Sequence, residues 1–420
     1  MLLVIAAAIA VAWSVLVPVV ATATPAATPA VTAVPVPGTM AVEQYPTGSC
    51  STVGTVALIS ATVGCLAVLR PQHPGAVLLA YLKGETCAGR PTCPADTTSP
   101  EYARNNLGSR VRGSGRNTFL MQPDNPAWMA SVAAQCRAAV TAGWDGCLLD
   151  MMGPASFALV KPHRSITGIA VPGAKPPAVY TGAAWAALAA SLYSYVQANV
   201  PATAHLTANG LAAPLCVPAP GCVIAKSLYP TNGLIADNSS GTDYGAELES
   251  FPCQESGTVP PPCITDAEVA AWHATTTTSS AAEHLEIIDH RGNAPVDHDT
   301  ALALFLLGDQ DPTHTWWAYC TNSVTDPACQ QPDGEYTAFY SNVLSASGYQ
   351  WLGAGSTTPS LYHSTWTQGD CFINTGADAQ VTIPGVAGQP AYELNATVDT
   401  AGASYTLPAG HGMCWAAVGP

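Results

Sequence analysis

The sequence predicts an α/β fold, namely a (β/α)8 TIM barrel followed by a small C-terminal antiparallel β-sandwich. Between residues 55 and 320, short apolar runs alternate with longer helix-compatible stretches, the pattern of repeated βα units around a parallel sheet. The number of such runs is eight, which is the strand number of this barrel. From about residue 345 the sequence becomes rich in Gly, Thr, Ser and Val and forms short alternating strands, as antiparallel sheets do.

The elements can be placed by their apolar runs and by the Gly and Pro residues between them. Barrel strands are expected at 55–59, 77–82, 118–122, 146–150, 204–209, 245–251, 284–289 and 315–320. Helices are expected at 127–141, 182–199, 266–279 and 299–307, and C-terminal strands at 380–384, 391–397 and 404–407. The first barrel strand is the least distinctive, because residues 41–60 could equally pair outside the barrel.

The segment that ends at Asp150 is the most informative part of the chain. Residues 128–140 are Ala-rich and contain no Gly or Pro, which predicts a helix that closes at Gly143. The strand that follows is apolar without alternation, as suits a parallel strand covered on both faces. Asp150 would then emerge at the carboxyl edge of the sheet, where such folds hold their chemistry.

The N-terminus has the features of an export signal. Residues 2–21 carry no charge, and small residues follow at 21–23, where a signal peptidase would cut. An uncleaved anchor is the alternative, since the run is about long enough to span a bilayer at ~20 residues. We therefore expect a secreted protein, or one anchored through residues 2–21. The predicted organisation is a signal peptide at 1–23, an Ala/Thr/Pro-rich linker at 24–40, the barrel at 41–344 and the β-sandwich at 345–420.

The cysteine count indicates the redox compartment of the protein, and the net charge excludes one class of partner. The 14 cysteines are an even number, which favours disulfides and an oxidising compartment. No Cys-x-x-Cys pair is present to nucleate a zinc site. The formal charge of −15 argues against a nucleic-acid partner, because an acidic surface repels phosphates. Neighbouring cysteines can pair as Cys50/Cys65, Cys87/Cys93, Cys136/Cys147, Cys216/Cys222, Cys253/Cys263, Cys320/Cys329 and Cys371/Cys414.

Several motifs, taken in order, resemble a known family. They are Leu69–Tyr81, Asp124–Trp128, Gly143–Asp150, Ala208–Gly210, Glu249–Phe251 and Ala301–Leu307. Together they are similar to a group of secreted TIM-barrel glycoside hydrolases related to α-galactosidase-like and endo-α-galactosaminidase-like barrels, over residues 65 to 415. The chain departs from that group at Gln122, where members usually show an Asp near the end of the third strand, and at His73, where they have Asn. These departures bear on substrate specificity more than on fold.

The resemblance implies a glycoside hydrolase that acts on α-linked sugars by a retaining mechanism. Such chemistry needs two carboxyl groups across the scissile bond. By resemblance, Asp150 on the fourth strand is the nucleophile and Glu249 on the sixth strand is the acid/base. Glu247 stays open as an alternative acid, because period-two alternation puts it on the same side as Glu249. Asp289 would take the acid role in a rival scheme. The plainer alternatives are an Asp150 that caps the next helix or pairs with a base, and an exposed loop Glu249.

Polar side chains at the predicted strand ends are candidates for holding a sugar. We expect no catalytic metal and no cofactor, since HExxH, Walker, GxGxxG and GxSxG motifs are all absent from the sequence. The expected partner is an oligo- or polysaccharide. Alternative functions are a non-catalytic carbohydrate-binding or cell-surface barrel and a polysaccharide lyase or deacetylase on a similar barrel. The candidate substrate-binding residues are Tyr81, Lys83, Gln122, Asn209, Glu247, Asp289 and Tyr319.

Overall fold

The structure of the protein is a computed structural model. The described residues are 36–43, 50, 54–89, 92–112, 118–152, 168–176, 178–209, 244–251, 264–266, 269–270, 272–273, 283–289, 297–308, 315–319, 333–343, 348–356, 358–395 and 397–417. Residues 34–420 form one compact unit. The predicted signal peptide lies outside the described residues.

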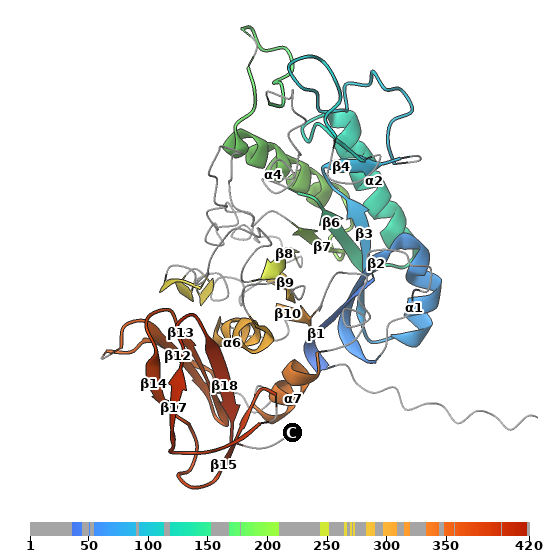
Figure 1. Cartoon of the computed structure of the whole chain (residues 1–420). Coiled ribbons are helices and arrows are strands. Elements are labelled where there is room, and N and C mark those ends of the chain that lie inside the picture. Colours follow the sequence, from blue (N-terminus) through green and yellow to red (C-terminus); the bar gives the residue numbers. More distant parts are fainter. Residues whose placement is uncertain are drawn as a thin grey trace, which may run out of the picture. The chain divides into compact units, whose positions relative to one another are not determined.

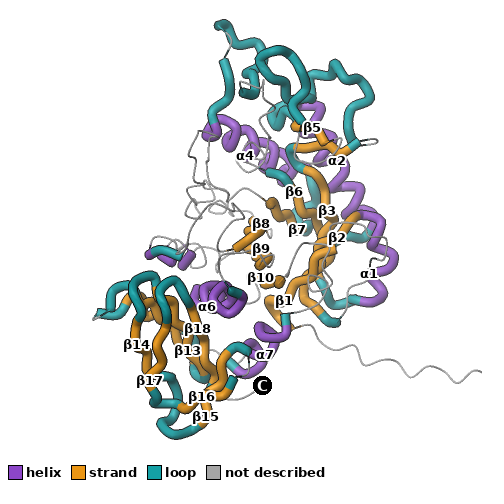
Figure 2. The backbone as a smooth tube through the Cα atoms, in the orientation of Figure 1, coloured by secondary structure: helices purple, strands orange, loops and turns teal. Residues whose placement is uncertain are grey.

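Eight parallel strands form the central sheet (Figures 1 and 2). Their hydrogen-bonded order is β1-β10-β9-β8-β7-β6-β3-β2, and β2 pairs in turn with β1. The parallel α/β fold is therefore confirmed. The described residues do not include a helix after every strand, so the regular (β/α)8 arrangement stays a prediction. The strands are β1 (Val36–Glu43), β2 (Val56–Thr62), β3 (Val77–Lys83), β6 (Gly146–Asp150), β7 (His205–Asn209), β8 (Tyr244–Phe251), β9 (Glu283–Asp289) and β10 (Thr315–Tyr319).

One predicted barrel strand was wrong. Residues 118–120 form β5, which pairs antiparallel with β4 (Thr86–Ala88) in a separate two-stranded sheet. Strand β3 pairs directly with β6, and β1 supplies the remaining strand although residues 36–40 were expected to be linker. A short apolar run does not specify its partner, so sequence could not separate these cases. Asp150 and Glu249 still lie on the fourth and sixth strands of the central sheet.

Helix α2 (Pro126–Ala142) begins and ends as the sequence indicates. The Asn125 side chain accepts hydrogen bonds from the N–H groups of Ala127 and Trp128, and Pro126 occupies the first turn, where it loses no hydrogen bond. The helix closes at Gly143, whose φ of 110° is costly for other residues. The remaining described helices are α1 (Leu66–Gln72), α4 (Gly182–Asn199), α6 (His298–Gly308) and α7 (Gly334–Asn342), with a short 3-10 turn at Val63–Cys65.

Four of the seven expected disulfides are confirmed, and the other three lie outside the described residues. The bonds join Cys50 to Cys65, Cys87 to Cys93, Cys136 to Cys147 and Cys371 to Cys414. Among the helices that the structure describes, none has the length and apolarity needed to cross a membrane.

The C-terminal residues form antiparallel sheets, as expected. A six-stranded sheet has the order β11-β12-β13-β18-β15-β16, and β14 pairs with β17 in a two-stranded sheet. Apolar side chains from both sheets, including Phe372, Val381, Leu407 and Trp415, form one buried cluster. The strands are β11 (Gln350–Ala354), β12 (Leu361–Trp366), β13 (Gly369–Asn374), β14 (Ala379–Thr382), β15 (Pro390–Glu393), β16 (Val398–Thr400), β17 (Ser404–Leu407) and β18 (Gly412–Ala416).

Helix α6 connects this module to the central sheet. Residues 300–308 are all buried, which explains why the helix is apolar on every side. Its side chains share one core with Trp317 of β10 and with Ile373 of β13. On β18 the Gly412 N–H donates to Thr300 Oγ1 at 3.1 Å. A Cβ on Gly412 would overlap Ile373 and come within 3.0 Å of the Ala303 Cβ.

We therefore expect Gly412→Ala to destabilise the protein by about 1–3 kcal/mol, because the added methyl overpacks this contact. Unfolding by denaturant, followed by fluorescence, measures the change. Gly334→Ala is the matched control, since nothing lies within 4 Å of a Cβ there. Equal stability of the two variants would contradict close packing of α6 against β18.

Candidate active site

The carboxylate of Asp150 is the centre of the candidate site. Asp150 is the last residue of β6 and is only 5% exposed. Its Oδ2 accepts from the Tyr81 hydroxyl and from Lys83 Nζ, the latter at 2.5 Å. Its Oδ1 accepts from Asn209 Nδ2 at 3.0 Å and from the Met151 N–H at 2.7 Å. An ionised carboxylate only accepts hydrogen bonds and so fits this ring of donors.

The side-chain donors come from β3 and β7, the strands on either side of β6, and the fourth donor is the Met151 N–H directly after β6. Strand register pairs Lys83 with Asp150, and it pairs the residue before Asp150 with the residue before Asn209. Tyr81 lies two residues before Lys83 and therefore on the same face of β3. Lys83 Nζ also donates to the Tyr81 hydroxyl. The structure thus brings together Asp150 and three residues that sequence placed at strand ends.

Backbone strain marks the same point. Met151 has a φ of 61°, an uncommon conformation for a residue with a side chain. This conformation accompanies the hydrogen bond from its N–H to Asp150. Strained residues of this kind cluster at functional sites, where surrounding contacts hold them in place. Sequence analysis did not identify Met151, since its conformation leaves no pattern in the chain.

The candidate acids lie on β8, two strands away from Asp150. Register pairs Glu247 with Asn209, and Glu249 follows two residues later. Two strand spacings put the backbones about 10 Å apart. A retaining mechanism needs carboxyl groups about 5–5.5 Å apart, so the two side chains would have to extend toward each other. Register also places Glu286 of β9 beside Glu247, a residue that sequence analysis missed. The side chains of these three glutamates lie outside the described residues.

Among the described residues, Gln122 makes its side-chain hydrogen bonds to residues other than Asp150. Its Nε2 donates to Asp124 Oδ1 and to the Tyr180 hydroxyl, both at 2.7 Å, and Gln122 is 5% exposed. Burial raises the pKa of Tyr180, although the Gln122 hydrogen bond opposes this. Because β5 lies outside the central sheet, the expectation that Gln122 ends a barrel strand was wrong.

Asp289 and Tyr319 end the neighbouring strands β9 and β10 and pair in register. The Asp289 side chain lies outside the described residues. The Tyr319 ring stacks on the His298 ring, with 4.0 Å between centroids. Tyr319 therefore contacts a second group of polar residues, which sequence analysis did not identify.

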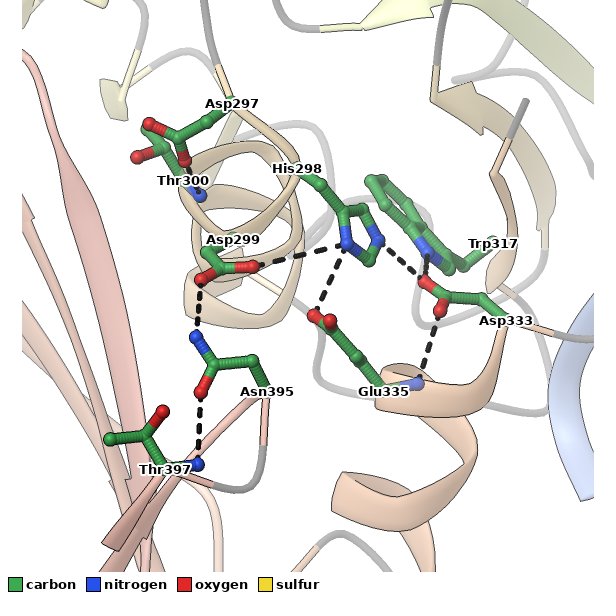
Figure 3. Close-up of polar contacts among 9 residues, drawn as sticks. All are labelled: Asp297, His298, Asp299, Thr300, Trp317, Asp333, Glu335, Asn395 and Thr397. Carbon is green, nitrogen blue, oxygen red and sulfur yellow. Dashed lines mark hydrogen bonds and ion pairs between the residues drawn. The ribbon is translucent and has the colours of Figure 1, made fainter. Parts of the chain in front are cut away.

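We call this second group the histidine–carboxylate cluster: His298 and Asp299 at the start of α6, with Asp333 and Glu335 at the start of α7 (Figure 3). His298 Nε2 lies 2.8 Å from Asp333 Oδ2, and its Nδ1 lies 3.1 Å from Glu335 Oε2. The Trp317 indole also donates to Asp333, at 2.6 Å. Figure 3 shows the imidazole between the carboxylates. His298 and Asp333 are 35 positions apart in the sequence, so no local pattern indicates that they are in contact.

We expect the His298 imidazole in this cluster to be protonated. Burial alone would lower the pKa of His298, but the hydrogen bonds and charges of Asp333 and Glu335 raise that pKa to about 10. Burial, followed by the charge of Glu335, raises the pKa of Asp299 to about 6. Ligand atoms of His298, Asp299 and Glu335 lie within 4.8 Å of one another, a spacing that a metal ion would also fit. A metal would have to displace the imidazolium proton, because histidine binds metal as the neutral ring.

The raised pKa of His298 predicts a pH-dependent stability. Its folded-state pKa of about 10 exceeds the model value of 6.5, so its contribution is fully present below pH 6.5 and is lost as pH rises toward 10. We expect the stability difference between the wild type and His298→Gln to shrink over this interval. Denaturant titrations at several pH values measure that difference. A difference that stays constant or grows with pH would contradict a charged His298.

Neither a family model nor a curated protein matches the chain. The solved structures to which it is similar include the glycoside hydrolase domain of PelA from Pseudomonas aeruginosa, at 15% identity over 69% of this chain and 96% of that chain, with a TM-score of 0.42.

Two further similar structures are Ega3 from Aspergillus fumigatus in complex with galactosamine and the GH36 α-galactosidase AgaA from Geobacillus stearothermophilus. Ega3 is 10% identical over 70% of this chain and 94% of its own, with a TM-score of 0.38. AgaA is 10% identical over 86% of this chain and 51% of its own, also with a TM-score of 0.38. Of these three structures, the PelA domain is a glycoside hydrolase and AgaA is an α-galactosidase.

Proposed function

We propose that this protein is a glycoside hydrolase in which Asp150 is the nucleophile. The observation that carries the proposal is the Asp150 carboxylate itself, nearly buried at the carboxyl edge of a parallel sheet and surrounded by donors from the two flanking strands and from the Met151 N–H. Burying a carboxylate costs free energy because the group loses its hydration. A buried carboxylate next to a strained residue is typical of a functional site. Parallel α/β proteins place their reactive groups at this edge.

The proposed reaction uses Asp150 and Glu249 in two steps. Asp150 attacks the anomeric carbon while Glu249 protonates the departing glycosidic oxygen, which gives a covalent glycosyl–enzyme. Glu249 then takes a proton from water, and the water oxygen displaces Asp150. Asp150 is regenerated as a carboxylate and Glu249 as an acid. Retention and an α-linked substrate are what the family resemblance implies.

The donors around Asp150 suggest how a sugar would enter. Both carboxylate oxygens already accept two hydrogen bonds, so a substrate must displace one donor to reach an oxygen. The Lys83 side chain is 23% exposed, whereas that of Asp150 is 6% exposed. Tyr81 and Asn209 are likewise only partly buried. Because the lysine side chain is long and flexible, we propose that Lys83 is the donor that moves onto a sugar hydroxyl when substrate binds.

The wider proposal is an exported (β/α)8 hydrolase with a C-terminal β-sandwich at 345–420. The confirmed disulfides support an oxidising compartment. Export through residues 1–23 is proposed from sequence. Glu247 and Asp289 remain alternative acids at the same edge.

A non-catalytic carbohydrate-binding protein is the second candidate. The observation that favours it is the near-complete burial of Asp150, since a carboxylate with all its acceptor sites filled could serve structure alone. One observation distinguishes the two candidate functions: only a hydrolase releases new reducing ends from a glycan.

Asp150→Asn should lower turnover by several powers of ten, because an amide cannot attack the anomeric carbon. Unfolding should stay cooperative, although some stability is lost where the amide nitrogen meets hydrogen-bond donors. The assay incubates the protein with a panel of α- and β-linked polysaccharides and follows released sugars by mass spectrometry. Asp378→Asn is the control, because Asp378 is exposed. Full activity in Asp150→Asn would remove the nucleophile assignment, and glycan binding without release by the wild type would select the second candidate.

Glu249→Gln should lower kcat/KM for substrates with poor leaving groups by at least about a hundredfold and leave kcat/KM for activated aryl glycosides nearly unchanged, because their departure needs no proton. It should lower kcat for both, because the second step loses its base. Glu247→Gln and Glu286→Gln are the comparisons on the same sheet edge. Steady-state kinetics with both substrate types measures the contrast. If the leaving-group dependence appears in Glu247→Gln instead, the acid is Glu247.

A further inference from the structure

Glu85 is a buried carboxylate close to Asp150 that takes no part in the proposed reaction. It follows β3 by two residues and is 0% exposed, so no substrate can touch it. The Trp185 indole of α4 donates to Glu85 Oε2 at 2.6 Å, and this contact is buried. A buried charge is costly unless it is hydrogen-bonded, which indicates that this carboxylate has a role in holding the structure.

The backbone at Gly84 and Glu85 continues the β3–β6 pairing beyond the two strand ends. The Gly84 N–H donates to the Asp150 carbonyl at 2.7 Å, and the Glu85 N–H donates to the Met151 carbonyl at 3.2 Å. These are the peptides on either side of the strained turn. The Glu85 peptide thus touches the one residue whose N–H is directed at Asp150 Oδ1.

Further contacts fix the Gly84–Glu85 peptide from the other side. The Trp128 indole donates to the Gly84 carbonyl at 2.9 Å, and the Met121 N–H donates to the Glu85 carbonyl at 2.8 Å. A Cβ on Gly84 would overlap the Met152 side chain and lie 3.2 Å from the Asp150 carbonyl oxygen, so this peptide packs closely against the turn after β6. A movement of this peptide would therefore also move Met151, through the hydrogen bonds to the Asp150 and Met151 carbonyls.

We propose that Glu85 is a positioning residue for Asp150. Its hydrogen bond with Trp185 anchors the Gly84–Glu85 peptide to α4, which holds the Met151 N–H on Asp150 Oδ1. The catalytic consequence rests on the proposed function, whereas the geometric link stands on the contacts alone. The anchor requires an acceptor oxygen at this position, which receives the indole hydrogen bond.

The test compares two variants that differ in the anchoring bond. Glu85→Gln keeps an oxygen that can accept from Trp185. The double variant Glu85→Gln with Trp185→Phe removes the donor without leaving a buried charge. Trp415→Phe is the control, because it removes an indole hydrogen bond to Asp399 in the C-terminal module. Amide hydrogen exchange at Met151 is read by NMR, together with kcat and KM on a cleaved glycan.

The double variant should exchange the Met151 amide at least about tenfold faster and lose about tenfold in kcat with KM nearly unchanged. Glu85→Gln and Trp415→Phe should change neither quantity by more than about threefold. Unchanged Met151 exchange in the double variant overturns the proposal, as does faster exchange in an enzyme with full kcat. If the wild type cleaves no glycan, the proposed function fails, and Met151 exchange still decides the geometric link.

Discussion

The ion pair between Lys83 and Asp150 joins the ends of two neighbouring parallel strands, and the candidate site is built around it. A carboxylate that is 6% exposed at its side chain needs compensation for lost hydration. Lys83 and Tyr81 supply it from β3, and Asn209 supplies it from β7. The strained peptide after Asp150 adds a fourth donor, so the sheet, the turn and the charge depend on one another.

A different electrostatic arrangement holds the starts of α6 and α7. There the cation is His298, and its carboxylate neighbours outnumber it. Residues 292–420 contain no lysine or arginine, so histidine is the only side chain in that part of the sequence that can carry a positive charge. Asn395 also donates to Asp299 at 3.1 Å, which ties the C-terminal module to this cluster. Asp150 is thus paired with a lysine, whereas the carboxylates of the histidine–carboxylate cluster are paired with His298.

Sequence reasoning succeeded where local pattern decides the structure. Uniformly apolar strands predicted a parallel sheet, and residues at strand ends, such as Tyr81, Lys83 and Asn209, converge because parallel strands share one carboxyl edge. It failed where partner choice depends on the assembled fold. Residues 118–120 pair with β4 in a separate two-stranded sheet instead of joining the main sheet, and the Glu85–Trp185 contact joins residues 100 positions apart that no periodic pattern links.

Direct trapping of the covalent intermediate tests the central claim about Asp150. The protein is incubated with an inactivator that is a fluorinated analogue of the sugar it cleaves. It is then digested, and the labelled peptide is identified by mass spectrometry. The account predicts one sugar per protein, attached to the Asp150 carboxylate. A label on another carboxylate, or an active enzyme that passes through no covalent intermediate, would contradict it.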